Sequence, residues 1–445
     1  MTETYWLEHA WLGAGEAVDG VLVRVEDERF AAVEPGVPQP PEEAHRLTGL
    51  TVPGMANCHS HAFHRALRGR TQRGRGTFWT WREQMYALAE RLDPDSYHEL
   101  ARATFREMVA SGHTSVGEFH YLHHGPDGKP YDDPNAMGVA VIEAARDAGI
   151  RIALLDTCYV TSRIMSPPEG VQARFSDGNA DAWAARVERL EHDDRDDVVL
   201  GAAVHSVRAV PPVQMRTVAS WAQARRAPLH AHLSEQVAEN EECLAAYGRT
   251  PTGVLAEAGV LGERSTVVHA THLTRGDVET LGRTRTHSCF CPTTERDLGD
   301  GIGPSRRLHL SGSRLTLGSD SHAVIDAFEE MRAVELDERL ATQERGHWSA
   351  EELLVAATST GHASLGFPDV GRIESGARAD LVTLDLDSPH LAGTGPAAES
   401  AVFAAGAADV GQVVRDGRVV FRRDQRREIG HELSKAIGRL WKEDR

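Results

Sequence analysis

The chain has 445 residues, of which 41% are hydrophobic and 26% are charged, a composition typical of soluble globular proteins. Its formal net charge of -18 argues against broad binding to nucleic acids or anionic membranes, because both require a basic protein surface. The sequence contains no apolar run of about 18 residues and no secretory signal segment. We therefore expect a cytoplasmic protein of one to three domains that binds neither nucleic acid nor membrane.

Residues 5–52 alternate apolar and polar side chains and predict a set of short strands. Between residues 51 and 365, short apolar runs alternate with helix-like segments, as in repeated βα units. Eight of these runs are predicted strands: Leu50–Met55, Thr114–His120, Ile152–Tyr159, Val198–Val204, Pro228–Leu233, Thr266–Ala270, His287–Cys291 and Leu315–Gly318. Helices are expected at Tyr97–Ser111, Ala136–Ala148, Val213–Arg225 and Thr252–Ala258. This pattern predicts an α/β fold with a (β/α)8 TIM-like barrel. An open doubly wound sheet is disfavoured because no glycine-rich phosphate loop follows the first strand.

The end of the chain returns to short strands, predicted at Asp380–Asp385, Ser400–Phe403, Val410–Arg415 and Arg418–Phe421. A polar amphipathic helix, Ile429–Lys442, follows them. Because both ends are rich in predicted strands, we expect one small β-sandwich domain formed by residues 1–52 and 367–445. The barrel would then occupy residues 53–366.

A long loop rich in glycine and arginine, residues 68–77, follows the first predicted barrel strand. Loops at this end of barrel strands build active sites, so one interpretation is a lid over the site. The other interpretation, an ordinary solvated loop, fits its charge equally well.

The five cysteines are scattered and odd in number, which in a chain without a secretory signal predicts reduced thiols. Cys289 and Cys291 are separated by one residue inside an apolar run. We interpret them as small buried strand residues, and a pair of thiolate metal ligands is the alternative.

Side chains that can bind a metal fall at the ends of the predicted strands. His59 and His61 are two residues apart, a spacing that directs both imidazoles to one face of an extended strand. The others are His205 after the fourth strand, His230 and His232 on the fifth with Glu235 close behind, His269 on the sixth, and Asp320 after the eighth. Because active sites of such barrels lie at the C-terminal ends of the strands, we expect these side chains to converge.

This arrangement resembles the amidohydrolase superfamily, with His-x-His after strand one, histidines on strands five and six, and aspartate after strand eight. The spacing from His232 to Glu235 is similar to the His-x-x-Glu of its deaminase branch. Within that branch the chain most resembles the formimidoylglutamate deiminases. The stretches that carry this resemblance are residues 59–63, 78–82, 117–123, 205–210 and 291–301.

The resemblance implies that His59, His61, His232 and Asp320 bind one Zn²⁺ per subunit, a ligand set that suits zinc. Two metals would usually require a modified lysine on strand four, but no lysine lies between Lys129 and Lys435. His230 faces the same side as His232 and competes with it for the ligand role. His232 is preferred because it makes the His-x-x-Glu spacing.

The resemblance also implies hydrolysis of N-formimino-L-glutamate to N-formyl-L-glutamate and ammonia, a step of histidine degradation. Glu235, His269 and Asp320 would be catalytic. The carboxylates of this anionic amino-acid substrate would be bound by Arg82 and Arg208, because guanidinium groups pair bidentately with carboxylates. Further substrate contacts are implied for His64, Tyr121 and His205, and the family pattern predicts a homodimer.

One departure concerns His64, which stands where the family pattern predicts a glutamine. Two alternatives remain open. A nucleobase or other cyclic-amidine deaminase of the same superfamily would use the same metal ligands but would need a pocket for a flat ring without paired arginines. A non-catalytic relative would usually lack at least one ligand, and here every ligand position is filled.

Overall fold

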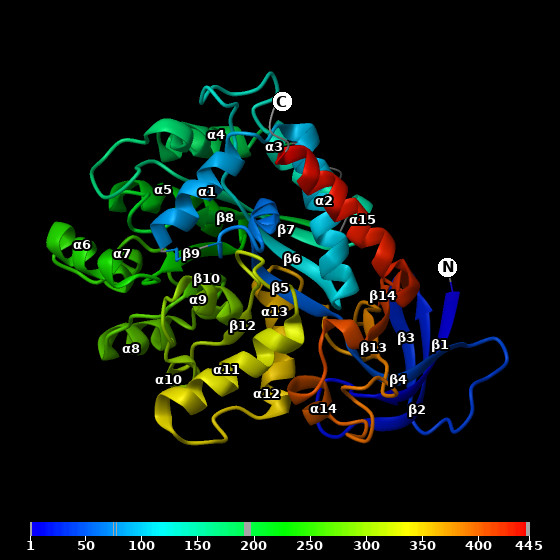
Figure 1. The fold of residues 1–445 in the computed structure, drawn as a ribbon. Coiled ribbons are helices and arrows are strands. Elements are labelled where there is room, and N and C mark those ends of the chain that lie inside the picture. The colour runs from blue at the N-terminus through cyan, green and yellow to red at the C-terminus, as the bar shows by residue number, and fades with distance from the viewer. Residues whose placement is uncertain (1, 74, 77, 191–196, 442–445) are drawn as a thin grey trace.

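The computed structural model describes residues 2–73, 75–76, 78–190 and 197–441 (Figure 1). An eight-stranded parallel sheet forms a nearly closed barrel, and a separate seven-stranded mixed sheet is built from the two ends of the chain. This arrangement confirms the predicted fold class. The barrel strands are β5 (Met55–Ser60), β6 (His113–His120), β7 (Arg151–Cys158), β8 (Val198–Val204), β9 (Leu229–Leu233), β10 (Ser265–His269), β11 (His287–Phe290) and β12 (Leu315–Leu317).

Helices connect the barrel strands, and their ends have clear local causes. Helix α2 (Pro94–Ala110) begins where Asp93 caps it, with the fixed φ of Pro94 in the first turn. Helix α3 (Ala136–Ala148) ends at Gly149, whose φ of 77° lets the chain leave the helix. The others in this region are α1 (Phe78–Ala89), α4 (Ala180–Val187), α5 (Pro212–Arg225), α6 (Val237–Tyr247), α7 (Pro251–Glu257), α8 (Arg275–Thr284), α9 (Pro292–Leu298), α10 (Ser305–Ser311), α11 (Ala327–Thr342), α12 (Ala350–Val355) and α13 (Gly361–Ser364).

The terminal sheet has the strand order β15-β14-β13-β4-β1-β2-β3. Its strands are β1 (Thr2–Ala10), β2 (Val18–Glu26), β3 (Arg29–Glu34), β4 (His45–Pro53), β13 (Leu381–Leu384), β14 (Val410–Arg415) and β15 (Arg418–Arg422). The two parts are joined by a buried ion pair, in which Arg151 at the start of β7 donates to both oxygens of Asp380, next to β13. The division of the chain at residues 52–53 and 366–367 remains a prediction.

Two predicted strands are wrong. Leu50–Met55 is not the first barrel strand, because residues up to Pro53 belong to β4 and pair with β13. The chain passes between the sheets at Gly54, where an added Cβ would lie 2.4 Å from the Thr114 hydroxyl oxygen. Ser400–Phe403 lies in helix α14 (Ala398–Phe403).

The terminal helix is α15 (Arg426–Leu440), which runs alongside α2 and is tied to it by a 2.5 Å ion pair between Arg106 and Glu432 (Figure 1). The predicted end of this helix, Lys442, lies outside the described residues, as do Gly74 and Thr77 of the predicted loop. Within the described part of the chain, no helix is both long and apolar enough to span a membrane.

Candidate active site

The barrel closes where β5 meets the end of β12, and this seam brings three predicted site residues together. The backbone N–H groups of Ser319 and Asp320 donate to the carbonyl oxygen of His59 at 3.1 and 2.9 Å, and the N–H of His61 donates to the carbonyl of Asp320 at 3.3 Å. Gly318 permits this approach, because a Cβ there would lie 2.7 Å from the Cβ of His59. The backbone therefore places His59, His61 and Asp320 side by side.

Four side chains, which we term the His/Asp group, have ligand atoms that all lie within 4.8 Å of one another: His59, His61, His232 and Asp320. The Nε2 atoms of His59 and His232 are 3.0 Å apart, and Asp320 Oδ1 lies 3.2 Å from His59 Nε2 and 3.3 Å from His61 Nε2. Ligands of a tetrahedral zinc at about 2.0 Å would be separated by about 3.3 Å. The group therefore has the spacing that a metal ion needs. His230, its sequence competitor, is outside this group.

Backbone carbonyls fix the orientation of two of these imidazoles. The Nδ1 atom of His61 lies 3.0 Å from the carbonyl oxygen of Phe119, and that of His232 lies 2.9 Å from the carbonyl oxygen of His205. A carbonyl oxygen only accepts, so each Nδ1 carries the proton. Each Nε2 is then left with its lone pair directed into the group, as a metal ligand requires.

A second ring of polar residues holds the seam and was not identified from the sequence. Asn57 donates to the Ser319 hydroxyl at 2.6 Å, and Ser60 donates to Glu118 at 2.5 Å. His322 bridges the two sides of the seam: its Nδ1 lies 2.9 Å from Ser319 Oγ, after β12, and its Nε2 lies 3.1 Å from Ser60 Oγ, on β5. Burial raises the pKa of Glu118 to about 7, although Ser60 and the N–H of Ala62 donate to its carboxylate.

The ends of three barrel strands carry unusual backbone angles at the site. The φ angles are 51° at Ser234, 71° at His269 and 42° at Asp320, in the left-handed region that non-glycine residues rarely adopt. Each such residue costs about 1–3 kcal/mol. The hydrogen bonds of the surrounding structure hold these angles, and two of the three side chains, His269 and Asp320, line one pocket.

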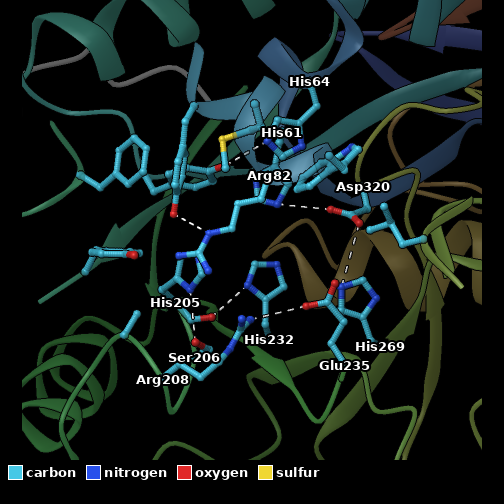
Figure 2. A pocket seen from close by; sticks show the side chains of 18 of the residues that line it. His61, His64, Arg82, His205, Ser206, Arg208, His232, Glu235, His269 and Asp320 are labelled. Atoms are coloured by element: carbon cyan, nitrogen blue, oxygen red, sulfur yellow. Dashed lines mark hydrogen bonds and ion pairs between the residues drawn. The ribbon is translucent and has the colours of Figure 1, made fainter. Parts of the chain in front are cut away.

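One pocket is lined by every predicted site residue except His59 (Figure 2). His59 belongs to the His/Asp group, whose other three members line this pocket. From the His/Asp group the pocket reaches to two arginines, Arg82 on α1 and Arg208 in the loop after β8. The remaining predicted residues that line it are His64, Tyr121, His205, Glu235 and His269. Helix α1, which follows the glycine- and arginine-rich loop, thus contributes directly to the pocket wall.

Each arginine of the pocket has defined neighbours. Arg82 Nε donates to the Tyr86 hydroxyl at 2.5 Å, and Gln172 donates to the same hydroxyl at 3.0 Å. Arg208 forms ion pairs with Glu239 at 3.1 Å and with Glu235 at 3.5 Å. Burial alone lowers the pKa of Arg208, but these two carboxylates outweigh it and hold the pKa above its ordinary value, so the guanidinium stays charged.

Aromatic residues and histidines complete the wall. His64 lies in a short 3-10 turn, and its Nε2 is 2.9 Å from the Tyr121 hydroxyl oxygen. The ring centroid of His205 lies 5.6 Å from that of Tyr121 and 4.9 Å from that of Tyr159. Burial is the main reason that the pKa of Tyr121 stands well above its ordinary value, so its hydroxyl keeps its proton.

His269 is held by a residue that sequence reasoning missed. Its Nδ1 lies 3.3 Å from Glu295 Oε1, and the same oxygen accepts the N–H of Cys291 at 2.9 Å. The other ring nitrogen of His269 is 4.0 Å from Asp320. Glu295 lies in the stretch 291–301 that carries the resemblance, but its role emerges only when the fold brings this residue of α9 next to His269 at the end of β10.

Comparison with known proteins assigns the chain to a family. Residues 50–420 match the profile of the amidohydrolase family. The chain belongs to the amidohydrolase family. It is 36% identical over 433 residues to formimidoylglutamate deiminase of Pseudomonas aeruginosa, covering 94% of this chain and 92% of that relative. It is 28% identical over 382 residues to 5-methylthioadenosine/S-adenosylhomocysteine deaminase of Pelotomaculum thermopropionicum, covering 85% of this chain and 82% of that relative.

Solved structures agree with this assignment. The chain matches an amidohydrolase from Brucella melitensis with a TM-score of 0.90 and 30% identity, over 99% of this chain and 100% of that one. It matches an adenosine deaminase from Xanthomonas campestris with bound zinc at a TM-score of 0.84 and 21% identity, over 98% of each chain, a likeness that concerns the fold alone. As an amidohydrolase the chain is an enzyme, and hydrolytic deamination is the class of reaction that its relatives support.

A second buried group of this amidohydrolase, His120, His123 and Asp156, also has ligand atoms close together. Its carboxylate is already occupied, because Arg186 donates to both oxygens of Asp156 at 2.7 and 2.9 Å. Trp183 Nε1 donates to the same carboxylate at 2.8 Å. The guanidinium supplies the positive charge here, so the group is an internal charge network and not a second metal centre.

Cys289 and Cys291 are buried, and all five cysteines are free thiols.

Proposed function

We propose that this amidohydrolase converts N-formimino-L-glutamate to N-formyl-L-glutamate and ammonia, as part of histidine degradation. The observation that carries the proposal is the presence of Arg82 and Arg208 in the same pocket as the His/Asp group. Two guanidinium groups suit a substrate with two carboxylates, and they have no obvious use for a neutral flat ring. The 36% identity to formimidoylglutamate deiminase supports the same substrate.

His59, His61, His232 and Asp320 would hold one Zn²⁺. A zinc ion bound there would lower the pKa of a water molecule to about 7 and so supply a nucleophile at neutral pH. The spacing of the four ligand atoms and the carbonyl contacts of His61 and His232 fit this ion. Its identity as zinc is part of the proposal.

The proton transfers are assigned to three side chains of the pocket. Glu235 hydrogen-bonds the amidine nitrogen and keeps it protonated, which makes the formimino carbon more electrophilic. Asp320 takes the proton of the attacking water and passes it toward the departing ammonia. His269, oriented by Glu295, hydrogen-bonds the oxygen that adds to this carbon. Acid–base catalysis of this kind contributes about 10²–10⁴-fold per group.

The remaining pocket residues are assigned to the glutamate part of the substrate. Arg82 and Arg208 bind its carboxylates, with Tyr121 and His205 as further hydrogen-bonding partners. His64 has one nitrogen on the Tyr121 hydroxyl, so its contribution passes partly through that tyrosine.

Ammonia release from a panel of substrates tests the proposal. We expect turnover of N-formimino-L-glutamate and no comparable activity on guanine, cytosine or adenosine. The panel must include 5-methylthioadenosine and S-adenosylhomocysteine, because a relative at 28% identity is named for their deamination. Preferred turnover of a purine compound would replace the proposal with the alternative, a nucleobase or other cyclic-amidine deaminase.

A homodimer and a cytoplasmic location remain predictions, and sedimentation analysis would test the first.

A further inference from the structure

We propose that Glu239 is the residue that positions Arg208 for the substrate carboxylate. This inference rests on the proposed function, because it concerns how the pocket receives a carboxylate. Glu239 lies in α6, near the start of the helix, and is 1% exposed. No motif in the sequence identifies it, since it lies outside the His-x-x-Glu spacing that marks Glu235.

The Glu239 carboxylate is fixed in place from one side. Its Oε1 accepts the backbone N–H of Ser234 at 2.9 Å, in the turn between His232 and Glu235. Its position is therefore tied to the segment that carries both a predicted metal ligand and a predicted catalytic carboxylate. The other oxygen, Oε2, lies 3.1 Å from Arg208 Nε in an ion pair, although the N–H is not aligned for a hydrogen bond.

Exposure separates the roles of the two partners. The side chain of Glu239 is fully buried, whereas that of Arg208 is 20% exposed and lines the pocket. The buried Glu239 thus contacts the Nε edge of the guanidinium. A terminal nitrogen, Nη2, lies 3.5 Å from Glu235 (Figure 2). A carboxylate bound from the pocket would meet the terminal nitrogens without displacing Glu239.

This geometry explains why two glutamates surround one arginine. With Glu239 as a permanent counter-ion, Arg208 does not depend on Glu235 and can turn its terminal nitrogens to the substrate. Glu235 is then free for the amidine nitrogen. An arginine that is already fixed also loses less side-chain freedom on binding, which strengthens the complex. Glu239 would therefore act on substrate binding and not on the chemical step.

The test is Glu239→Gln, which keeps the shape and the acceptor for Ser234 but removes the charge. We expect KM for N-formimino-L-glutamate to rise about tenfold, as for loss of one charge-assisted contact, with kcat within about threefold of wild type. Binding of the product N-formyl-L-glutamate, measured by calorimetry, should weaken by a similar factor. Glu241→Gln, on the exposed face of α6, is the matched control and should change neither value.

A double-mutant cycle distinguishes positioning from a general structural effect. In an Arg208→Ala background, Glu239→Gln should produce no further rise in KM; an equal rise in both backgrounds, or an unchanged KM in the single variant, overturns the proposal. If Glu239→Gln does not fold, Glu239→Asp is measured instead. Aspartate keeps the charge but is one methylene shorter and withdraws the carboxylate from Arg208, so KM should again rise, and an unchanged KM overturns the proposal. If the wild-type protein turns over the substrate and the Glu239 variants have the wild-type KM, this inference alone is contradicted. Wild-type protein that neither turns over formimino-glutamate nor binds the product overturns both proposals.

Discussion

Several side chains of the site are oriented by a neighbouring group that takes no part in the proposed reaction. His61 and His232 are oriented by backbone carbonyls, His269 by Glu295, and Arg208 by Glu239. Orientation by such partners lowers the cost of binding and of proton transfer, because the groups need not rearrange when substrate arrives. Single substitutions should therefore separate binding from chemistry.

The first prediction concerns Arg208. Arg208→Ala removes a guanidinium whose two carboxylate partners, Glu235 and Glu239, are then left without their cation. KM for N-formimino-L-glutamate should rise about 10²-fold, with a smaller change in kcat, because truncating one partner of a buried charge pair costs several kcal/mol. Steady-state ammonia release measures both values. An unchanged KM would argue for a different substrate.

The second prediction concerns Glu295. Glu295→Gln weakens the hold on His269 Nδ1, so kcat should fall about 10–100-fold, as for other residues that orient an active-site histidine, while KM stays within about threefold. Asp297→Asn, an exposed carboxylate of the same helix, should leave both values unchanged. A loss confined to KM would assign Glu295 to substrate binding instead.

The sequence identified the residues that face the pocket better than the residues that support them. Spacings that the chemistry itself imposes mark His59 with His61 and His232 with Glu235. Asp320 is marked by its position after the eighth predicted strand. Glu118 and Glu239 were missed because their contacts depend on folding: Ser60 and Glu118 are 58 residues apart, and Glu239 meets Arg208 only after α6 packs. His322, two residues after Asp320, has no role in the sequence patterns, because its contacts with Ser60 and Ser319 arise only in the folded seam.

Among the elements, the seam between β5 and β12 matters most. It is held by few backbone hydrogen bonds, and it carries three of the four members of the His/Asp group. A closed barrel leaves no exposed strand edge, but here closure also sets the distance between His59 and Asp320. Small changes in the seam should therefore appear first as changes in metal binding.

The third prediction tests this seam. In Gly318→Ala the added methyl group would lie 2.7 Å from His59 Cβ, so β12 must shift away from β5. We expect a loss of about 1–3 kcal/mol in the free energy of unfolding and a metal content well below one ion per chain. Urea unfolding and elemental analysis measure these. Gly276→Ala, where the nearest atom is 3.9 Å away, is the control, and full metal content in Gly318→Ala would contradict the account.

Element boundaries show where sequence patterns stop being sufficient. Residues Leu50–Met55 look like one apolar run, yet they belong to two sheets: β4 ends at Pro53 and β5 begins at Met55. The run appears continuous because the chain is buried on both sides of Gly54. Ser400–Phe403 is short and apolar, a pattern that also fits one buried turn of helix. By contrast, α3 and β8 match their predictions residue for residue, and Gly149 marks the end of α3.

For the whole molecule, buried histidines set the dependence of stability on pH. Burial lowers the pKa of His113, His123, His287 and His362 to about 4. In the unfolded chain their pKa is about 6.5, so the unfolded state binds more protons between these values. The stability that they contribute is complete above pH 6.5 and is lost as the pH falls toward 4.

The fourth prediction follows from this sign. The free energy of unfolding should decrease as pH falls from 6.5 to 4.5, by up to about 1.4 kcal/mol per pH unit for each such histidine. His113→Gln should make the decrease shallower, whereas His431→Gln, on the exposed side of α15, should leave it unchanged. Urea midpoints at several pH values measure it. Stability that rises on acidification would contradict the assignment of neutral buried imidazoles.

Metal titration of stripped protein is the most direct test of the central claim that His59, His61, His232 and Asp320 form one metal site serving the arginine-lined pocket. Zinc is added back while formimino-glutamate turnover and bound zinc are measured on the same sample. We predict that activity saturates at one zinc per chain, and that Asp320→Asn neither retains that zinc nor regains activity. Full activity without metal, or saturation at two ions per chain, would contradict the account.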